Sequence, residues 1–176
     1  ARVRAAAARA LLAVAEPAAA EAVLIMALQD SAESVRAEAA GSLGQLPLSA
    51  AASRPLLAAT KSDSSPLVRE KAAYALGTAW PQMSDDEQST VQQALLDIAA
   101  SAREIEGVRI AAVHAFGRRG SAAGSERIVA IVRRSAEPPA LRRMAIDVIG
   151  QLRLGSAVPV LASIAGGGGG GGAREL

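Results

Sequence analysis

One phrase recurs along this chain, and its spacing constrains the fold more than any other feature. It reads "VRAEAAGSLG" at 35–44, "VREKAAYALG" at 68–77, "VRIAAVHAFG" at 108–117 and "LRRMAIDVIG" at 141–150, and "VRAAAARALL" at 3–12 fits except at its last position. The phrase arginines, separated by 32, 33, 40 and 33 residues, are Arg4, Arg36, Arg69, Arg109 and Arg142. A fixed period of this size, broken by one insertion, indicates a solenoid of stacked repeats.

Each unit also holds a second helical segment before the phrase. These segments occupy 20–30, 53–63, 89–102, 125–135 and 156–165, and their apolar residues recur at spacings of three and four. That pattern is typical of a helix with one buried face, so each unit is expected to be two helices. Aromatic residues make up only 2% of the chain, and its abundant alanine favours closely packed helices without strands. The sequence therefore predicts an all-α solenoid of antiparallel helix pairs.

Capping residues mark the junctions between the predicted helices. Ser84 with Glu87, and "DSAE" at 30–33, each provide the acceptor and the returning glutamate of a capping box, while Pro66 and Pro138 suit a first helical turn. The later phrases end in a glycine, which either lets the chain leave through a left-handed conformation or lets a neighbouring helix approach closely. These glycines are Gly44, Gly77, Gly117 and Gly150.

The repeated phrase resembles the HEAT repeats, and particularly the short bacterial type labelled phycobilisome-lyase-like. The resemblance is carried by D-x-x-x-x-V-R-x-x-A-A-x-x-L-G at 30–44 and 63–77, and by Pro55 and Pro159 in the preceding helices. It implies a right-handed superhelix used mostly as a surface for other macromolecules. We expect one array of about five repeats over 1–165, with a glycine run and the start of a further repeat at 166–176.

The resemblance also implies a structural role for the phrase arginines. In the family, this arginine pairs with the loop aspartate or with carbonyls of the adjacent repeat, forming a ladder along the stack. Asp30 and Asp63 stand six residues before Arg36 and Arg69, but Glu104 and Glu137 stand only five before the later arginines. We therefore expect a ladder that becomes irregular in the second half. Its members are Arg4, Arg36, Arg69, Arg109, Arg142, Asp30 and Asp63.

Candidate partner-binding residues follow from the helical position of the phrase. The valine, the alanine pair and the leucine are expected to be buried, so positions one and five after the arginine should lie near the concave surface. An exposed aromatic among polar residues suits recognition of a partner, although a lone Tyr or His is also common on a helix surface without a special role. The strip contains the chain's single Tyr and single His, and consists of Glu70, Tyr74, His114, Arg143 and Asp147.

The insertion at 78–90 holds the single tryptophan, Trp80, followed by Pro81. Trp80 is either a binding anchor on an extended loop or a cover for the apolar end of its repeat. The second interpretation is preferred, because one large ring in an aromatic-poor chain is valuable for packing.

Charge is distributed unevenly, which leaves a second class of partner open. Residues 1–102 carry a net charge of −3, and residues 103–153 carry +5. The basic second half permits contact with nucleic acid or with an acidic protein. Aromatic residues that would stack on bases are not interleaved with its arginines, so another protein is the preferred partner. The basic residues concerned are those of "GRRG" at 117–120, Arg127, Arg133, Arg134, Arg142 and Arg143.

Catalysis, cofactors and metal binding are not expected. The chain has no cysteine and one histidine, His114, which cannot form a metal site by itself. The glycine run at 166–172 lacks the Lys and Ser/Thr of a phosphate loop. A lyase-type enzyme is therefore third, behind a non-enzymatic protein-binding scaffold and a nucleic-acid or acidic-partner binder.

The glycine run raises a question about the ends of the chain. It is either a flexible linker or a stand-in for residues of unassigned identity, and the second is favoured because Arg174 lies 32 residues after Arg142. The chain also begins inside a repeat, so we expect a piece of a longer array. No segment reads as a signal peptide or a membrane span, and localisation stays open, with the cytoplasm preferred.

Overall fold

A computed structural model of the chain describes residues 1–79, 82–120 and 124–166. Over these ranges the chain forms ten α-helices and no β-strand. The predicted all-α class is therefore confirmed. No helix in the same ranges combines the length and the apolar character needed to cross a membrane.

The helices alternate between two kinds. Five carry the repeated phrase: α1 (Arg2–Val14), α3 (Glu33–Leu43), α5 (Pro66–Ala79), α7 (Glu106–Arg119) and α9 (Pro139–Gln151). The other five are α2 (Pro17–Ala27), α4 (Ser53–Ser62), α6 (Asp85–Ala100), α8 (Ser125–Arg133) and α10 (Val158–Ala165). Short 3-10 turns at Ala50–Ala52 and Gly155–Ala157 lead into α4 and α10.

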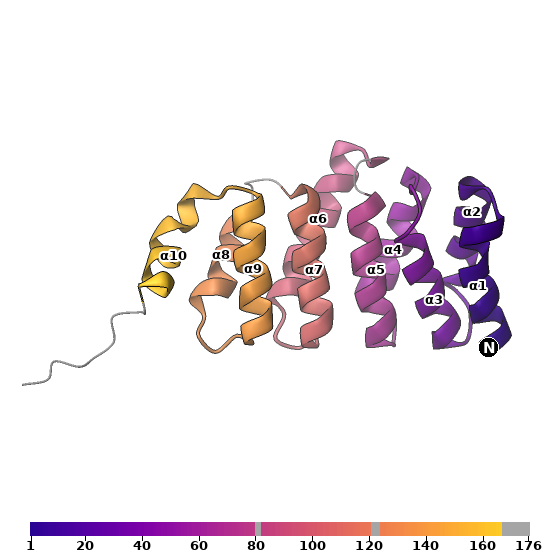
Figure 1. Cartoon of the computed structure of the whole chain (residues 1–176), viewed down its shortest axis with the longest axis horizontal. Coiled ribbons are helices and arrows are strands. Elements are labelled where there is room, and N and C mark those ends of the chain that lie inside the picture. Colours follow the sequence, from indigo (N-terminus) through magenta and orange to yellow (C-terminus); the bar gives the residue numbers. More distant parts are fainter. Residues whose placement is uncertain (80–81, 121–123, 167–176) are drawn as a thin grey trace, which may run out of the picture.

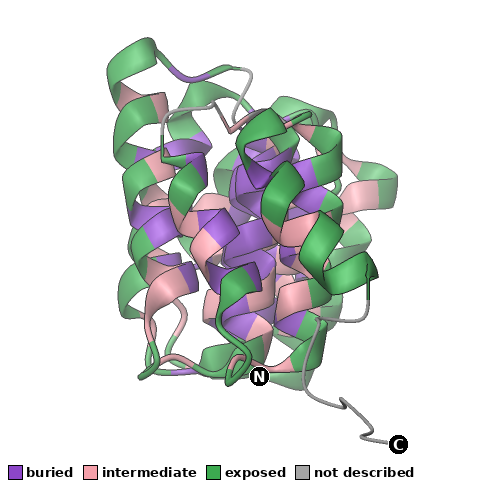
Figure 2. Cartoon of the chain, turned by 90° about the vertical axis from the view of Figure 1, so that its left-hand side faces the viewer, coloured by how far each residue is buried: buried purple, intermediate pink, exposed green. Residues whose placement is uncertain are grey.

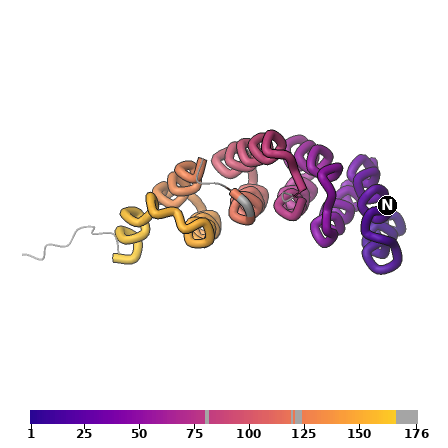
Figure 3. Tube along the Cα trace, turned by 90° about the horizontal axis from the view of Figure 1, so that it is seen from above, coloured from indigo at the N-terminus to yellow at the C-terminus, as the bar shows by residue number. Residues whose placement is uncertain are grey.

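The helices form a curved array of two layers. They stand side by side from α1 at one end to α10 at the other (Figure 1). Seen from above, the array bends into an arc, and the phrase-bearing helices lie on the inner side (Figure 3). We call these five helices the inner layer and the other five the outer layer. The predicted solenoid, with its arginine-bearing helices lined on one side, is confirmed; the first and last helices lie too far apart for a globular bundle.

The apolar residues of the phrase hold the two layers together. In α5, the valine, the alanine pair and the leucine are Val68, Ala72, Ala73 and Leu76, and none is exposed to solvent. Their spacing of three and four residues places them on one side of the helix. Buried residues accordingly gather between the layers (Figure 2). The stack is thus stabilised by many small side chains in close contact.

The phrase glycines allow close approach of neighbouring inner helices. A Cβ atom at Gly117 would lie 2.5 Å from Cγ2 of Val148, and one at Gly77 would lie 3.2 Å from the Cα of Ala115. None of the phrase glycines has a positive φ, so the left-handed alternative is wrong. Gly150 has no atom within 4 Å of an added Cβ, so close approach does not account for that glycine.

One of the two predicted capping boxes is present. The Ser84 hydroxyl oxygen accepts a hydrogen bond from the Glu87 backbone N–H, and the Ser84 backbone N–H donates one to the Glu87 carboxylate. This confirms the capping box before α6. The box expected at 30–33 is wrong, because α3 begins at Glu33 with Ala32 as its N-cap. Asp30 instead accepts from the Ala32 backbone N–H at 2.9 Å, and its carboxylate also binds Arg4.

Candidate functional site

An open groove of about 310 Å³ lies where α3, α5 and α7 stand side by side in the inner layer. We call it the concave groove. Counted after the phrase arginine, position five supplies the residues at its centre, and positions two, six, eight and nine supply its sides. Its lining residues are Gly41, Gly44, Gln45, Lys71, Tyr74, Ala75, Thr78, His114 and Arg118.

The concave groove exists because α3 has no side chain at two positions that face it. Position five carries Arg9, Tyr74, His114 and Asp147 in the other inner helices, but Gly41 in α3. The space beside Gly41 is reached by the Lys71 ammonium, whose Nζ lies 3.2 Å from where a Cβ at Gly41 would stand. A missing side chain on one helix therefore leaves room for the cation of the next.

Two aromatic rings meet at the centre of the concave groove. The Tyr74 and His114 rings are 5.1 Å apart between centroids, in an edge-on arrangement with an interplanar angle of 61°. Such pairs prefer this geometry because the positive edge of one ring faces the negative face of the other. The sequence placed both residues on the concave strip, and the fold brings them into contact across α5 and α7.

Burial sets the charge state of this pair. It raises the pKa of the Tyr74 hydroxyl, and the Glu70 carboxylate raises it further. It also lowers the pKa of the His114 imidazole, with a smaller effect from Arg118. Both rings are therefore neutral near pH 7. The buried Nδ1 atom of His114 has no hydrogen-bond partner among the described residues.

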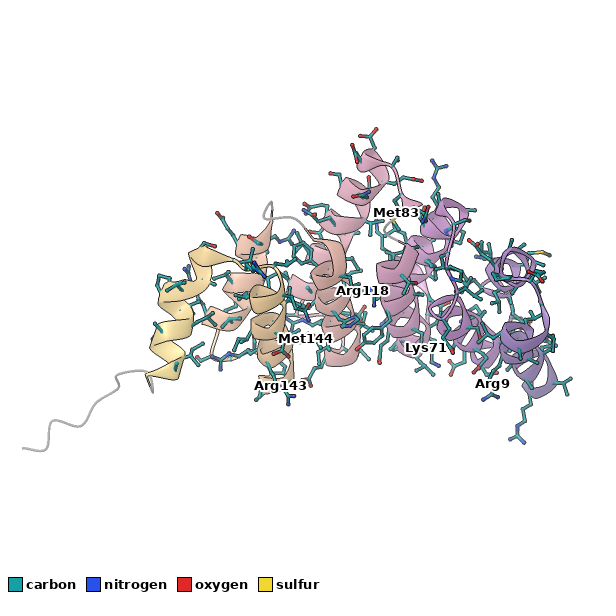
Figure 4. All side chains as sticks on the ribbon, turned by 45° about the horizontal axis from the view of Figure 1, so that its top comes forward. Arg9, Lys71, Met83, Arg118, Arg143 and Met144 are labelled. Atoms are coloured by element: carbon teal, nitrogen blue, oxygen red, sulfur yellow. The ribbon has the colours of Figure 1, made fainter. Side chains whose placement is uncertain are left out.

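Two cations flank the aromatic pair. Lys71 and Arg118 project from the inner layer, on the same side of the array as Arg9 and Arg143 (Figure 4). The Arg118 side chain lies over Gly77, with its Cδ 3.0 Å from where a Cβ there would stand. Neither Lys71 nor Arg118 forms an ion pair with an acid in the described ranges.

The remaining residues of the predicted strip lie outside the concave groove. Glu70 points toward the start of α7, where its Oε2 lies 2.6 Å from the position of a Cβ at Gly107. Arg143 and Asp147 are exposed on α9 and do not line the groove. Trp80 lies outside the described residues, so the prediction for its loop stays a prediction.

Sequence reasoning missed Lys71 and named Arg118 only within the basic "GRRG" segment at 117–120, although the helical period pointed to a place on the concave strip for both. Lys71 stands three residues before Tyr74, and Arg118 stands four after His114. Residues at these spacings share one face of a helix. Including positions two and nine after the phrase arginine would have placed both cations beside the strip.

The phrase arginines form a ladder that joins neighbouring repeats. Each of the first four binds the acid of the following repeat. The shortest nitrogen–oxygen distances are 2.8 Å for Arg4–Asp30, 2.7 Å for Arg36–Asp63, 2.8 Å for Arg69–Glu104 and 2.8 Å for Arg109–Glu137. The first three pairs are bidentate, with both oxygens of the carboxylate engaged. Such paired contacts suit the planar guanidinium, so the ladder fixes the register of the stack.

The ladder continues into the second half as far as Arg109, and the expected irregularity appears at Arg142. In the second half the acid stands one residue later in the repeat and is a glutamate instead of an aspartate. The longer side chains of Glu104 and Glu137 still bind the arginines of the preceding repeats. The acid six residues before an arginine serves it only through its backbone: Arg36 donates to the Asp30 carbonyl at 3.0 Å. Arg142 donates to the Val132 carbonyl at 3.1 Å and has no acidic partner in the described chain.

Three of the ladder acids, Asp30, Asp63 and Glu104, have a lowered pKa because of their ion pairs. The hydrogen bond from Arg36 holds the pKa of Asp63 below its ordinary value, and that from Arg69 does the same for Glu104. The pKa of the partly buried Asp30 carboxyl is lowered to about 2, chiefly by its hydrogen bond from Arg4. A lowered folded-state pKa stabilises the fold above the unfolded pKa of about 4, and this stabilisation is lost as the pH falls through the lowered value.

We therefore predict that acid weakens the array through its ladder. The free energy of unfolding should be insensitive to these carboxylates above about pH 5 and should fall progressively below about pH 4. Asp63→Asn should be less stable than the parent at neutral pH and should lose less on acidification. Urea unfolding at a series of pH values measures both. Equal pH slopes for Asp63→Asn and the parent would contradict the assignment.

The basic residues of the second half are dispersed over the array. Arg109 and Arg142 belong to the ladder. Arg127 pairs with Asp97 at 2.8 Å, and Arg134 lies 3.6 Å from Glu137. The side chains of Arg133 and Arg143 are exposed on different layers, one on α8 and the other on α9. The excess of positive charge in the sequence therefore does not form one continuous surface patch from these residues.

Comparison with protein families gives the array its name. A family model described as HEAT repeats matches residues 1–77. The first repeats of the chain are therefore similar to HEAT repeats. The later helix pairs continue the same two layers, so the described array is HEAT-like throughout (Figure 1). HEAT repeats commonly serve as non-enzymatic scaffolds for protein interactions. The match is to HEAT repeats in general, so the resemblance to the short bacterial type stays a prediction. No curated protein matches the chain significantly.

Proposed function

We propose that this chain is a non-enzymatic scaffold that binds another protein in the concave groove of its HEAT-like array. The observation that carries the proposal is the edge-on Tyr74–His114 pair, which lies in a groove with two cations that have no acidic partner among the described residues. Partner-binding surfaces are enriched in such partly buried aromatic anchors, with charged groups around them. The HEAT-repeat match supports the same class of function.

The rigidity of the surrounding helices supports the proposal. Tyr74 stands between Ala73 and Ala75, which are both fully buried, so its backbone is held by the packing of α5. An aromatic anchor presented by a packed helix loses little conformational freedom on binding, and this favours affinity. The concave groove is therefore suited to a partner that inserts one or two side chains beside the rings.

Binding of nucleic acid is the alternative class. The net charge of +5 over residues 103–153 favours it, whereas the dispersal of Arg127, Arg133, Arg134 and Arg143 does not. Nucleic acid is generally bound by a continuous basic groove with stacked aromatic residues. The two classes are separated by nuclease treatment of the captured material.

Replacing Tyr74 with alanine is expected to remove partner binding and spare the fold. A central aromatic anchor contributes about 2 kcal/mol or more, so the affinity should fall by roughly 30-fold. Because Tyr74 is only partly buried, its truncation leaves no closed cavity and the thermal melt should change little. Capture of partner proteins by the purified chain, with calorimetry on the identified partner and a parallel melt, measures both effects.

Two controls make the outcome decisive. Tyr74→Phe keeps the ring and should retain most of the binding. Met26→Ala removes an exposed apolar side chain from the outer layer and should change nothing. A large fall in melting temperature for Tyr74→Ala would make Tyr74 a packing residue, and captured proteins that disappear on nuclease digestion would favour nucleic acid instead.

A further inference from the structure

We infer that the concave groove recognises an acidic segment of the partner protein, with carboxylates placed between Lys71 and Arg118. The inference rests on the proposed function and adds the chemistry of the partner. Among the residues that the structure describes, two cations and no carboxylate line the concave groove. Carboxylate side chains of a partner are the groups that would complement this charge.

The groove cations differ from those arginines of the inner layer that are already paired with an acid. Ladder ion pairs already neutralise Arg36, Arg69 and Arg109. Arg9 lies 3.4 Å from the Glu38 carboxylate. Lys71 and Arg118 have no such partner in the described chain. An unpaired cation beside a partly buried surface keeps its attraction for an incoming anion, because no internal carboxylate must be displaced first.

The geometry brings the two cations to one surface. Lys71 extends over Gly41 on α3, and Arg118 extends over Gly77 on α5, so each reaches back across the helix before it. The neutral Tyr74–His114 pair lies between these helices and adds no charge of its own near pH 7. Glu70, the nearest acid in sequence, is turned toward Gly107 and does not line the concave groove.

An acidic protein segment fits this site better than a nucleic acid does. Of the described residues, two cations and one aromatic pair line the concave groove. Farther along the inner layer, Arg9 is paired with Glu38, and Arg143 stands on α9 outside the groove. A nucleic-acid backbone would require a longer run of free cations along its path. A short segment with one or two carboxylates and an apolar side chain requires only what is present.

Labelled peptides of one length test the charge directly. The probes are a peptide of about a dozen alternating Glu and Ala residues, its Gln counterpart, and a single-stranded oligothymidine of similar length, each measured by fluorescence anisotropy. The Glu peptide should bind, the Gln peptide should bind at least about tenfold more weakly, and added salt should weaken the Glu peptide's binding.

The chain offers matched controls for the two cations. Its two lysines are Lys71 in the concave groove and Lys61 on α4 in the outer layer, and Arg118 and Arg133 both lie in the last turn of their helices. Lys71→Glu and Arg118→Glu should each weaken binding of the Glu peptide by at least about tenfold. Lys61→Glu and Arg133→Glu make the same changes of charge elsewhere and should change it less than about threefold.

A third variant separates this inference from the proposed function. Gly41→Leu fills the concave groove without changing charge, and its added Cβ meets only the flexible end of Lys71. If Gly41→Leu abolishes capture of the partner protein while Lys71→Glu has no more effect than Lys61→Glu, the location stands and acid recognition is overturned. If the partner is captured equally by Gly41→Leu and the parent, the proposed function fails as well. Tighter binding of oligothymidine, lost in the same groove variants, would overturn the acidic-protein inference in favour of nucleic acid.

Discussion

Replacing Glu137 with alanine is expected to destabilise the array by about 3 kcal/mol, because it leaves a buried cation without its partner. The Arg109 side chain is only 6% exposed, and its Nη2 lies 2.8 Å from Glu137 Oε2. The geometry of that contact is an ion pair without a directed hydrogen bond. Arg109 also donates to the Ala99 carbonyl at 2.9 Å, which holds the guanidinium in place when the carboxylate is removed. The Arg109 side chain therefore cannot turn out to solvent without disrupting the helix pair to which it belongs.

The outermost rung is the control for this prediction. Arg4 and Asp30 make the same type of pair, but the Arg4 side chain is 56% exposed. Water can replace the carboxylate there, so Asp30→Ala should cost much less than Glu137→Ala. Urea unfolding of both variants, with slopes compared, gives the difference. Equal losses of unfolding free energy for the two variants would show that burial does not determine how much each ladder ion pair stabilises the array.

Replacing Phe116 with alanine is expected to cost about 3 to 5 kcal/mol, the usual range for a buried phenylalanine. Phe116 is the single phenylalanine of the chain, and its ring is fully buried within a core made largely of smaller side chains. Neighbouring alanines cannot expand to fill the space that the ring leaves, so the cavity should persist.

Phe116→Leu is the matched variant, because it keeps most of the apolar volume. We expect it to cost about 1 kcal/mol. Contacts in a solenoid are local, so hydrogen exchange in Phe116→Ala should accelerate most in α7 and its neighbours and least in α1 and α2. A uniform acceleration along the array, or equal losses for the two variants, would contradict the described packing.

The fold was predictable because each repeat records its own burial pattern in a short stretch of sequence. Apolar residues stand at the positions of Val68, Ala72, Ala73 and Leu76 in every later phrase, and each set packs one face of one helix against the core. Helix pairs and their order follow from that local signal. The family match adds nothing that the spacing did not already indicate for the first repeats.

Contacts between repeats were harder to predict. The sequence placed Asp30 beside Arg36 because they are six residues apart, yet the Asp30 carboxylate binds Arg4 of the preceding repeat. The same displacement explains why Glu104 and Glu137 fit the ladder although their spacing to the next arginine differs. Whether an acid binds the arginine of its own repeat or that of the preceding repeat depends on how the helices stack. The residue spacing within one phrase does not encode that stacking.

The candidate site was predicted in part. Tyr74 and His114 were singled out by their rarity and their helical position, and they meet in the concave groove. Lys71 was missed, and Arg118 was named only within the basic "GRRG" segment, because only two positions after the phrase arginine were considered for the strip. Gly41 was missed for a different reason: the concave groove depends on a side chain that is absent, and absence of a side chain marks a surface only when its neighbours are known.

The most direct measurement of partner binding at the concave groove is amine modification of the chain's two lysines, read by mass spectrometry with and without the captured partner protein. Lys71 lies in the concave groove and Lys61 on the outer layer, so the two residues report on opposite sides of one molecule. The account predicts that the partner slows modification of Lys71 by about tenfold or more and leaves Lys61 unchanged. Protection of Lys61 with Lys71 still reactive would place the partner on the outer layer and contradict it.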